Sequence, residues 1–316
     1  MSPRGPSQIL NRDIPFMSET DFQAPELEVM NTLLPAFEFG QILSANEWGA
    51  VYYAIQKSLD RYVAVKVFSP ALGQDERFME SYARSNSMVA GLRHPNLITV
   101  FDTGVIEGLP YIVMEFVQGK SLHRSMRGRI VELDPALGII REVCEGIAHA
   151  HERGLIHGNL DPLSILLNQV PSPKIGNFAL CGSIHTTSEA EPPEHFKAPE
   201  IHAGEAPTQA SDLYSIGAIF YELITGCAYG ADAPPASSLA QLPRAIDRVI
   251  EMATAFDPAE RGADVLAFYR HLQQAAGNGP KKVSLPVAVR RAPMVPGAAM
   301  RPAGRTAIRP QLKSLS

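Results

Sequence analysis

The chain has 316 residues, a net charge of −5, 45% hydrophobic residues and 19% charged residues. These values are typical of a soluble globular protein with one large core or two moderate ones. No stretch reaches the roughly 18 continuous apolar residues that a membrane-spanning helix needs, and the N-terminus lacks the apolar core of a signal peptide. We therefore expect a cytoplasmic protein with no transmembrane segment. Its three cysteines, Cys144, Cys181 and Cys227, are too widely spaced for a metal or redox motif.

The first part of the chain changes from polar to strand-like. Residues 1–34 are polar and contain four prolines, so we expect a disordered N-terminal segment. From residue 35 the sequence shows short apolar runs of strand length, interrupted by one helical segment over 75–92. The expected strands cover 37–43, 51–55, 62–68, 98–101 and 111–116.

After residue 119 the apolar period becomes helical. The expected helices cover 135–153, 211–225, 242–256 and 263–275. A mainly β segment followed by a mainly α segment predicts an α+β fold with two lobes. We expect a small β-rich N-terminal lobe with one helix at 35–116, a hinge at 115–119, and a larger, mainly α C-terminal lobe at 120–275.

The C-terminal segment has a different composition. Residues 276–316 are rich in proline and, from residue 280 onward, carry eight lysines and arginines with no acidic residue. Such a segment cannot bury a core, so we expect a basic disordered tail. It could be a solvated linker, or it could contact an acidic protein, nucleic acid or a membrane surface, because charge of one sign attracts such partners without specificity.

Between residues 36 and 275 short motifs follow one another in a recognisable order. They are a loop with one retained glycine at 42–51, Val-Ala-Val-Lys at 63–66, His-Pro-Asn at 94–96, an apolar strand at 111–116, His-Gly-Asn-Leu-Asp-Pro-Leu-Ser at 157–164, Asn-Phe-Ala at 177–179, Ala-Pro-Glu at 198–200, Ser-Asp-Leu-Tyr-Ser-Ile-Gly at 211–217, and Asp257-Pro258 with Arg261. This order resembles the protein kinase family in its bacterial serine/threonine form.

The resemblance implies that the positions that transfer phosphate are altered. In a kinase, one aspartate takes the hydroxyl proton, a lysine lies near the transferred phosphate, and an asparagine and an aspartate hold magnesium. These positions are occupied by Asn159, Asp161, Ser164 and Asn177, respectively. An amide accepts no proton at neutral pH, and a hydroxyl and an amide are poor substitutes for carboxylates on a hard cation. We therefore expect no intact catalytic residue and no metal site, although Asp161 could ligate a cation or act as a displaced base.

Other positions that the family uses for nucleotide are retained. The resemblance implies contacts to ATP, bound without magnesium, from Lys66, Gly49, Val51, Ala64, Met114, Glu115, Val117 and Leu166. The helix residue that should pair with Lys66 is Ser85, which cannot form an ion pair, and Glu80 lies at least a turn away. Lys66 could instead be a solvated or locally paired strand lysine.

The family's structural residues also persist. The resemblance implies an apolar stack of His157 and Phe178 between the lobes and an ion pair between Glu200 and Arg261. It also implies that Gly158 has removed the arginine that receives a phosphate on the segment containing Thr186, Thr187 and Ser188, and that Pro193 replaces a bridging threonine. The histidines at 149, 151 and 157 are interpreted as core or helix-end residues, because no cysteine or carboxylate completes a zinc site.

Three functions follow as hypotheses. The first is a pseudokinase, an interaction, scaffold or regulatory module in signalling that requires no cofactor and binds a protein such as an active kinase or its substrate. The second is a serine/threonine kinase or other nucleotide transferase with a non-standard active site. The third is a nucleotide sensor that binds ATP without metal.

Overall fold

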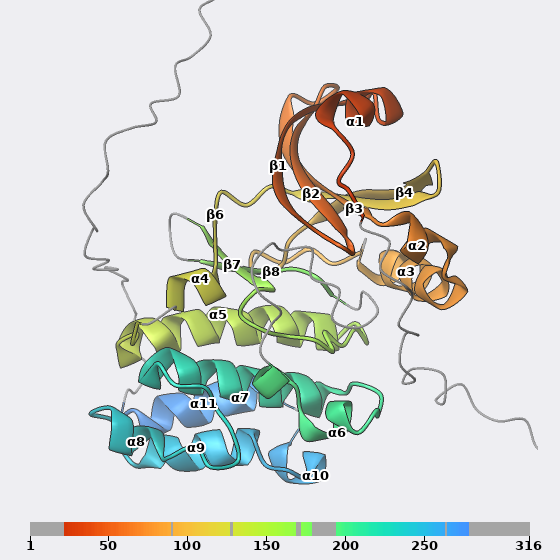
Figure 1. Cartoon of the computed structure of the whole chain (residues 1–316). Helices are drawn as coiled ribbons and strands as arrows, with labels where there is room; N and C mark the ends of the chain where they lie inside the picture. Colours follow the sequence, from red (N-terminus) through yellow and green to blue (C-terminus); the bar gives the residue numbers. More distant parts are fainter. Residues whose placement is uncertain are drawn as a thin grey trace, which may run out of the picture. The chain divides into compact units, whose positions relative to one another are not determined.

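The computed structural model describes residues 22–89, 91–126, 129–168, 172–178, 194–262 and 264–277, apart from the side chain of Ser87. All of these residues belong to one compact unit that ends at residue 285. Within it, a β-rich N-terminal lobe precedes a helical C-terminal lobe, which confirms the predicted two-lobed α+β fold (Figure 1). The expectations of disorder for residues 1–21 and for most of the basic tail lie outside the described residues.

The N-terminal lobe is built on a five-stranded antiparallel sheet with the order β1-β2-β3-β5-β4. Its strands are β1 (Phe37–Asn46), β2 (Gly49–Gln56), β3 (Arg61–Phe68), β4 (Val100–Ile106) and β5 (Leu109–Glu115). Burial alternates along β2, where Tyr52 and Ala54 are buried and Val51 and Tyr53 are half-buried. This alternation follows from the two-residue period of a strand, and it gives the sheet one fully covered face.

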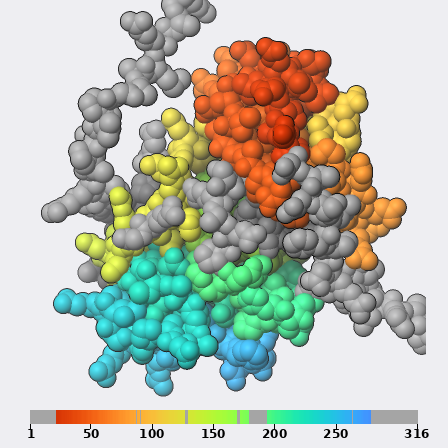
Figure 2. Space-filling model, in the orientation of Figure 1, coloured from red at the N-terminus to blue at the C-terminus, as the bar shows by residue number. Residues whose placement is uncertain are grey.

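A helix, α1 (Leu27–Leu33), covers that face of the sheet. Met30 is 0% exposed within the apolar cluster of the strands. The Tyr52 hydroxyl donates to the Pro25 carbonyl at 2.8 Å, and the Phe39 amide donates to Asn31 Oδ1 at 2.9 Å. The space-filling view shows α1 and the first strands, in red and orange, packed as one body (Figure 2). The expectation of disorder through residue 34 is therefore wrong for α1.

The helix expected over 75–92 is present as α3 (Glu76–Val89), and a short helix that the sequence did not predict, α2 (Pro70–Gln74), precedes it. Ser69 caps α2 and precedes a proline that suits the first helical position. Asp75 has an extended backbone and its carboxylate accepts from the Phe78 amide at 2.8 Å. This extended residue with a capping side chain ends one helix and begins the next.

The C-terminal lobe is mainly helical and carries a small sheet of β6 (Gly119–Ser121), β7 (Ile165–Asn168) and β8 (Pro173–Ile175). Its helices are α4 (Leu122–Met126), α5 (Leu133–His151), α6 (Pro199–His202), α7 (Gln209–Thr225), α8 (Ala236–Leu239), α9 (Ala245–Ala253), α10 (Pro258–Arg261) and α11 (Val265–Ala275), with a 3₁₀ turn at Glu194–Phe196. Helix α7 is buried on almost every side, as expected for a helix that is apolar all round. It forms the centre of this lobe's core together with α5, α9 and α11.

One buried ion pair ties the end of this lobe together. Both terminal nitrogens of Arg261 donate to the Glu200 carboxylate, at 2.6 and 2.8 Å, and the Arg261 side chain is 0% exposed. The predicted pair is thus present with bidentate geometry. Among the described residues, no helix combines the length and the apolar character needed to cross a bilayer.

Candidate functional site

Asp212 of helix α7 holds the loop at 157–164 in place. The Asp212 carboxylate, 1% exposed, accepts from the backbone amides of His157 and Gly158, each at 2.8 Å, and lies 2.8 Å from His151 Nε2. The His157 ring packs on Phe178 with centroids 4.7 Å apart, and its Nε2 lies 2.9 Å from the Gly176 carbonyl oxygen. The predicted apolar stack is therefore present. His151 and His157 have structural partners, and among the described residues no group of three metal-ligating side chains occurs.

Gly158 occupies a backbone conformation that favours glycine. Its φ is +75°, and an added Cβ would lie 3.0 Å from Pro207 Cγ. A side chain at this position would be strained and would also press against Pro207. The position of the family's arginine therefore has a backbone that favours glycine, and a side chain there would require Pro207 to shift.

The Asp161 carboxylate closes a turn within its own loop. Asp161 is 2% exposed, and its Oδ1 accepts from the amides of Leu163 and Ser164 and from the Ser164 hydroxyl, each at 2.9 Å. The Ser164 hydroxyl also lies 3.5 Å from the Asn159 carbonyl oxygen. Two positions that serve phosphate and metal in the family are thus bonded to each other. The three donors occupy Oδ1, so a cation or a proton would have to be bound through the buried Oδ2, and the two hypotheses for Asp161 stay predictions.

Lys66 lies in the interior, which excludes a solvated role. It is 1% exposed and its Nζ donates to Asn177 Oδ1 at 3.4 Å. Burial lowers the pKa of Lys66 from its ordinary 10.5 to about 7, because an ammonium group is poorly solvated there. Asn177 has a φ of +62°, a left-handed conformation that asparagine tolerates better than most residues.

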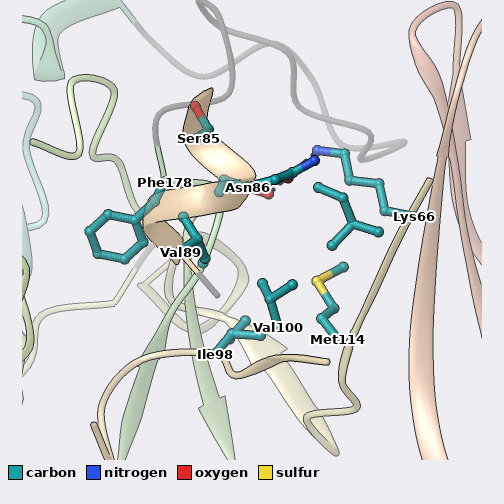
Figure 3. Close-up of a pocket in the computed structure, with 11 residues that line it drawn as sticks. Lys66, Ser85, Asn86, Val89, Ile98, Val100, Met114 and Phe178 are labelled. Atoms are coloured by element: carbon teal, nitrogen blue, oxygen red, sulfur yellow. Dashed lines mark hydrogen bonds between the residues drawn. The ribbon is translucent and has the colours of Figure 1, made fainter. Parts of the chain in front are cut away.

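A small cavity of about 40 Å³ lies beside Lys66, between the sheet and α3 (Figure 3). It is lined by Lys66, Ser85, Asn86, Val89, Ile98, Val100, Ile112, Met114, Gly176, Asn177 and Phe178. Lys66 reaches this cavity from β3, and Asn86 is the side chain of α3 that points toward it, whereas the Ser85 hydroxyl turns away from the lysine (Figure 3). Glu80 is exposed to solvent and takes no part in this lining.

Helix α3 is held by aromatic packing and a tyrosine. The Tyr82 hydroxyl donates to the carbonyl oxygens of Gly104 and Tyr111, at 2.9 and 2.6 Å. The Phe68 ring packs against Phe78 and Tyr82, with centroids 5.3 and 6.0 Å away. The position of α3 therefore rests on contacts other than the lysine–glutamate pair of the family. The half-buried Trp48, at the tip of the β1–β2 turn, packs against the same cluster.

Asn86 lines the cavity although the sequence did not single it out. It follows Ser85, and its side chain hydrogen-bonds the Tyr82 hydroxyl one turn earlier. The sequence does contain a signal that could have identified Asn86. Tyr82, Asn86 and Val89 are four and three residues apart, so they lie on the same side of the helix.

Only some of the residues that are expected to contact a nucleotide lie close to Lys66. Met114 lines the cavity with Lys66, and Ala64 pairs with Met114 across β3 and β5. Val51 pairs with Lys66 across β2 and β3. Glu115 is engaged in an ion pair, with Oε1 at 2.8 Å from Lys174 Nζ.

The other members of the set lie elsewhere. Gly49 is buried at the start of β2, and Leu166 pairs with Ser121 and Lys174 in the small sheet. Val117 is half-buried after β5. Among the described residues none of these three lines the cavity, so their contact with a nucleotide stays a prediction.

Several expectations concern residues outside the described part of the chain. They are Ala179, Cys181, Thr186, Thr187, Ser188 and Pro193.

Comparison with known proteins identifies the family. A family model described as "Protein kinase domain" matches residues 37–261, more than half of the chain. The chain therefore belongs to the protein kinase family, which confirms the resemblance.

Similar proteins include bacterial serine/threonine-protein kinases. PrkC of Bacillus subtilis (strain 168) is 27% identical over 248 residues, covering 71% of this chain and 38% of PrkC. PknB of Mycolicibacterium smegmatis is 32% identical over 207 residues, covering 60% of this chain and 32% of PknB. The chain thus spans about a third of the length of these two relatives. A crystal structure of the Mycobacterium tuberculosis PknI kinase domain matches with a TM-score of 0.66 at 23% identity, covering 76% of this chain and 96% of that one. This likeness shows the two-lobed kinase fold.

Proposed function

We propose that this protein is a pseudokinase, a kinase-fold module that regulates or scaffolds other proteins in signalling without transferring phosphate. The observation that carries the proposal is the hydrogen bond of 2.9 Å between Ser164 Oγ and Asp161 Oδ1. It joins a position that holds metal in the family to one that lies near the transferred phosphate. The Ser164 hydroxyl and one carboxylate oxygen of Asp161 are thereby used inside the loop.

The chemistry of the remaining donors supports the same proposal. Proton removal from an alcohol needs a base, and the Asn159 amide is not one. Magnesium prefers carboxylate oxygens and keeps its own water. The side chains at the family's metal positions are the Ser164 hydroxyl and the Asn177 amide, whose oxygen accepts from Lys66 at 3.4 Å. This donor set does not fit the magnesium site of the family, and we assign no step to the metal.

The proposed partner is a protein, such as an active kinase or a substrate that awaits phosphorylation. The basic C-terminal tail offers a second contact, to an acidic protein, nucleic acid or a membrane surface, because its eight positive charges are not balanced locally. The proposal requires no cofactor for this role. ATP could still bind near Lys66 without magnesium.

A second candidate is a serine/threonine kinase or another nucleotide transferase with an unusual active site. It is favoured by the similarity to PrkC and PknB and by the buried Lys66, which occupies the family's nucleotide-contacting position. Kinases of this family use ATP with magnesium.

A phosphate-transfer assay separates the two candidates. The full chain is incubated with γ-labelled ATP and either magnesium or manganese, with a general protein substrate and an active kinase as the positive control. We expect no transfer above background, for the chain and for Lys66→Met alike. Robust autophosphorylation that disappears in Lys66→Met would overturn the pseudokinase proposal.

A thermal-shift series then tests nucleotide binding. A ligand that binds only the folded protein raises its Tm. We expect any shift at millimolar ATP to be as large without magnesium as with it, because the metal has no carboxylate ligand at the two positions. A shift that appears only with magnesium would favour the working kinase.

A further inference from the structure

Two histidine rings connect the segment after α3 to α5. His94 lies between α3 and β4, in a segment of residues 94–98 that we call the α3–β4 connection, and His149 lies in the last turn of α5. Their ring centroids are 4.9 Å apart and their planes are inclined by 37°. Both residues are half-buried. The rings therefore form a direct contact between the connection and the helix.

The α3–β4 connection lies close against α5 and β8. Gly146 is three residues before His149 on α5. An added Cβ at Gly146 would lie 3.1 Å from Leu97 Cδ2 and 3.3 Å from Asn96 Cβ. On the other side, the Ile175 amide donates to the Asn96 carbonyl oxygen at 2.8 Å. The connection thus has a defined position on the C-terminal lobe, and His94 is its first residue.

The hydrogen-bond partners determine which nitrogen of each neutral ring carries the proton. The Asn96 backbone amide lies 3.2 Å from His94 Nδ1, and Arg153 Nη1 lies 3.2 Å from His149 Nδ1. A backbone amide and a guanidinium group can only donate, so both Nδ1 atoms are acceptors. In each neutral ring the proton is therefore on Nε2.

A second proton on His94 would break its hydrogen bond to the Asn96 amide. The proton would have to bind at Nδ1, where it would face another donor. His149 has no acceptor to offer the charged ring, because its Nδ1 is used by Arg153. Its Nε2 is buried and has no hydrogen-bond partner among the described residues. Protonation of His94 therefore acts against the contacts that hold the start of the connection.

The surrounding charges act in the same direction. Burial lowers the pKa of His94 below its ordinary 6.5, and His149, Arg153 and Lys174 lower this pKa further. The neighbour of His94 on its own segment, Arg93, is another cation. The carboxylates on the elements around the pair already have a cation or a hydrogen-bond donor as partner. They are Glu115, Glu142, Glu145 and Glu152.

We propose that His94, packed on His149, is a pH-sensitive switch that holds the α3–β4 connection against α5 while the ring is neutral and releases it when the ring is protonated. Release loosens the tie between the C-terminal end of α3 and the C-terminal lobe, because the connection begins five residues after α3 ends. The inference goes beyond the pseudokinase role and does not depend on whether the protein transfers phosphate.

The direction of the pH dependence follows from the lowered pKa. A histidine with a lower pKa in the held connection than in the released one binds fewer protons while the connection is held, so acid favours release. The connection is fully held above pH 6.5, the ordinary pKa of the residue, and loosens as the pH falls through that value.

Hydrogen exchange of the full chain, measured by NMR, tests the switch. Protection factors of the Asn96, Leu97 and Ile98 amides are compared at pH 7.5 and 5.5, after correction for the intrinsic exchange rate, with the amides of α7 as the reference. We expect the three amides to lose protection by about three- to tenfold at pH 5.5, and α7 to change much less. Equal changes in both segments, or no change in the connection, would overturn the proposal.

A substitution separates the proton from the hydrogen bond. His94→Asn keeps an acceptor, because asparagine Oδ1 stands where histidine has Nδ1, but it cannot titrate. It should retain most of the protection at pH 7.5 and show no further loss at pH 5.5. The control is His271→Asn, the same substitution at an exposed histidine of α11, which should keep the full pH dependence. If His94→Asn loses protection in acid as the unchanged protein does, the proposal is wrong.

The ring nitrogens give a second test that needs no variant. Nitrogen chemical shifts at pH 7.5 should show the proton on Nε2 of both His94 and His149, and His94 should titrate below pH 6.5. A proton on Nδ1 of either neutral ring, or titration of His94 at pH 6.5 or above, would contradict the switch.

Discussion

Two buried aspartates in the C-terminal lobe both accept hydrogen bonds from backbone amides, although they stand at positions that have different roles in the family. Asp212, 1% exposed, accepts from two backbone amides and lies beside His151. Asp161, 2% exposed, accepts from two backbone amides and a hydroxyl. The first is a structural residue of the family, whereas the second stands at a position that the family uses for phosphate. This comparison indicates that a position that contacts phosphate in the family can instead hold a side chain that stabilises its own loop.

The largest effect should come from Asp212. Asp212→Ala leaves three donors without their acceptor in the interior, and we expect unfolding free energy to fall by about 3–5 kcal/mol. Urea unfolding followed by circular dichroism measures this loss. The control is Asp257→Ala, where an exposed carboxylate caps the Ala259 amide at 2.9 Å; it should cost only about 1 kcal/mol.

A smaller but clear loss should follow Asp161→Ala, by about 2–3 kcal/mol, because three hydrogen bonds to a charged acceptor disappear. Asp161→Asn keeps an acceptor oxygen at this position and should cost about 1 kcal/mol. The same urea experiment measures both. Unchanged stability in Asp161→Ala would break the comparison with Asp212 and would return Asp161 to the list of candidate site residues.

The smallest effect concerns the glycine that replaces the family's arginine. Gly158→Ala should cost about 1–2 kcal/mol, from a left-handed backbone and from the contact with Pro207. Gly108→Ala is the matched control, because its φ is +77° and an added Cβ meets nothing within 4 Å. Thermal unfolding should show a smaller loss for Gly108→Ala. Equal losses would show that Pro207 contributes nothing.

Much of the fold could be predicted from the sequence, because its signals are local. Alternating apolar residues indicated β1, β2, β3 and β5 and only the first two residues of β4, and a helical period indicated α5, α7, α9 and α11. Helix α1 was missed because the prolines before it dominated the interpretation. The apolar spacing of Leu27, Met30 and Leu33 was present but short.

The candidate site was less predictable, because it depends on which way side chains turn. Motif order placed Lys66 and Asn177 in one cleft, and their hydrogen bond agrees with it. The inward direction of Asp161 could not be read from the sequence, since a carboxylate in a loop can face solvent, a ligand or its own backbone amides. The cavity at Ser85 is likewise a product of packing between segments that are distant in the chain.

Helix α1 also determines where this protein can safely be shortened. The family model begins at residue 37, yet Met30, seven residues before that boundary, is 0% exposed against the sheet. A fragment that begins at residue 37 would lack α1 and would expose the apolar face of the β-sheet that this helix covers. Such a fragment would tend to self-associate. Failure of such a fragment to bind a nucleotide would then reflect the missing helix rather than the chemistry of the cleft.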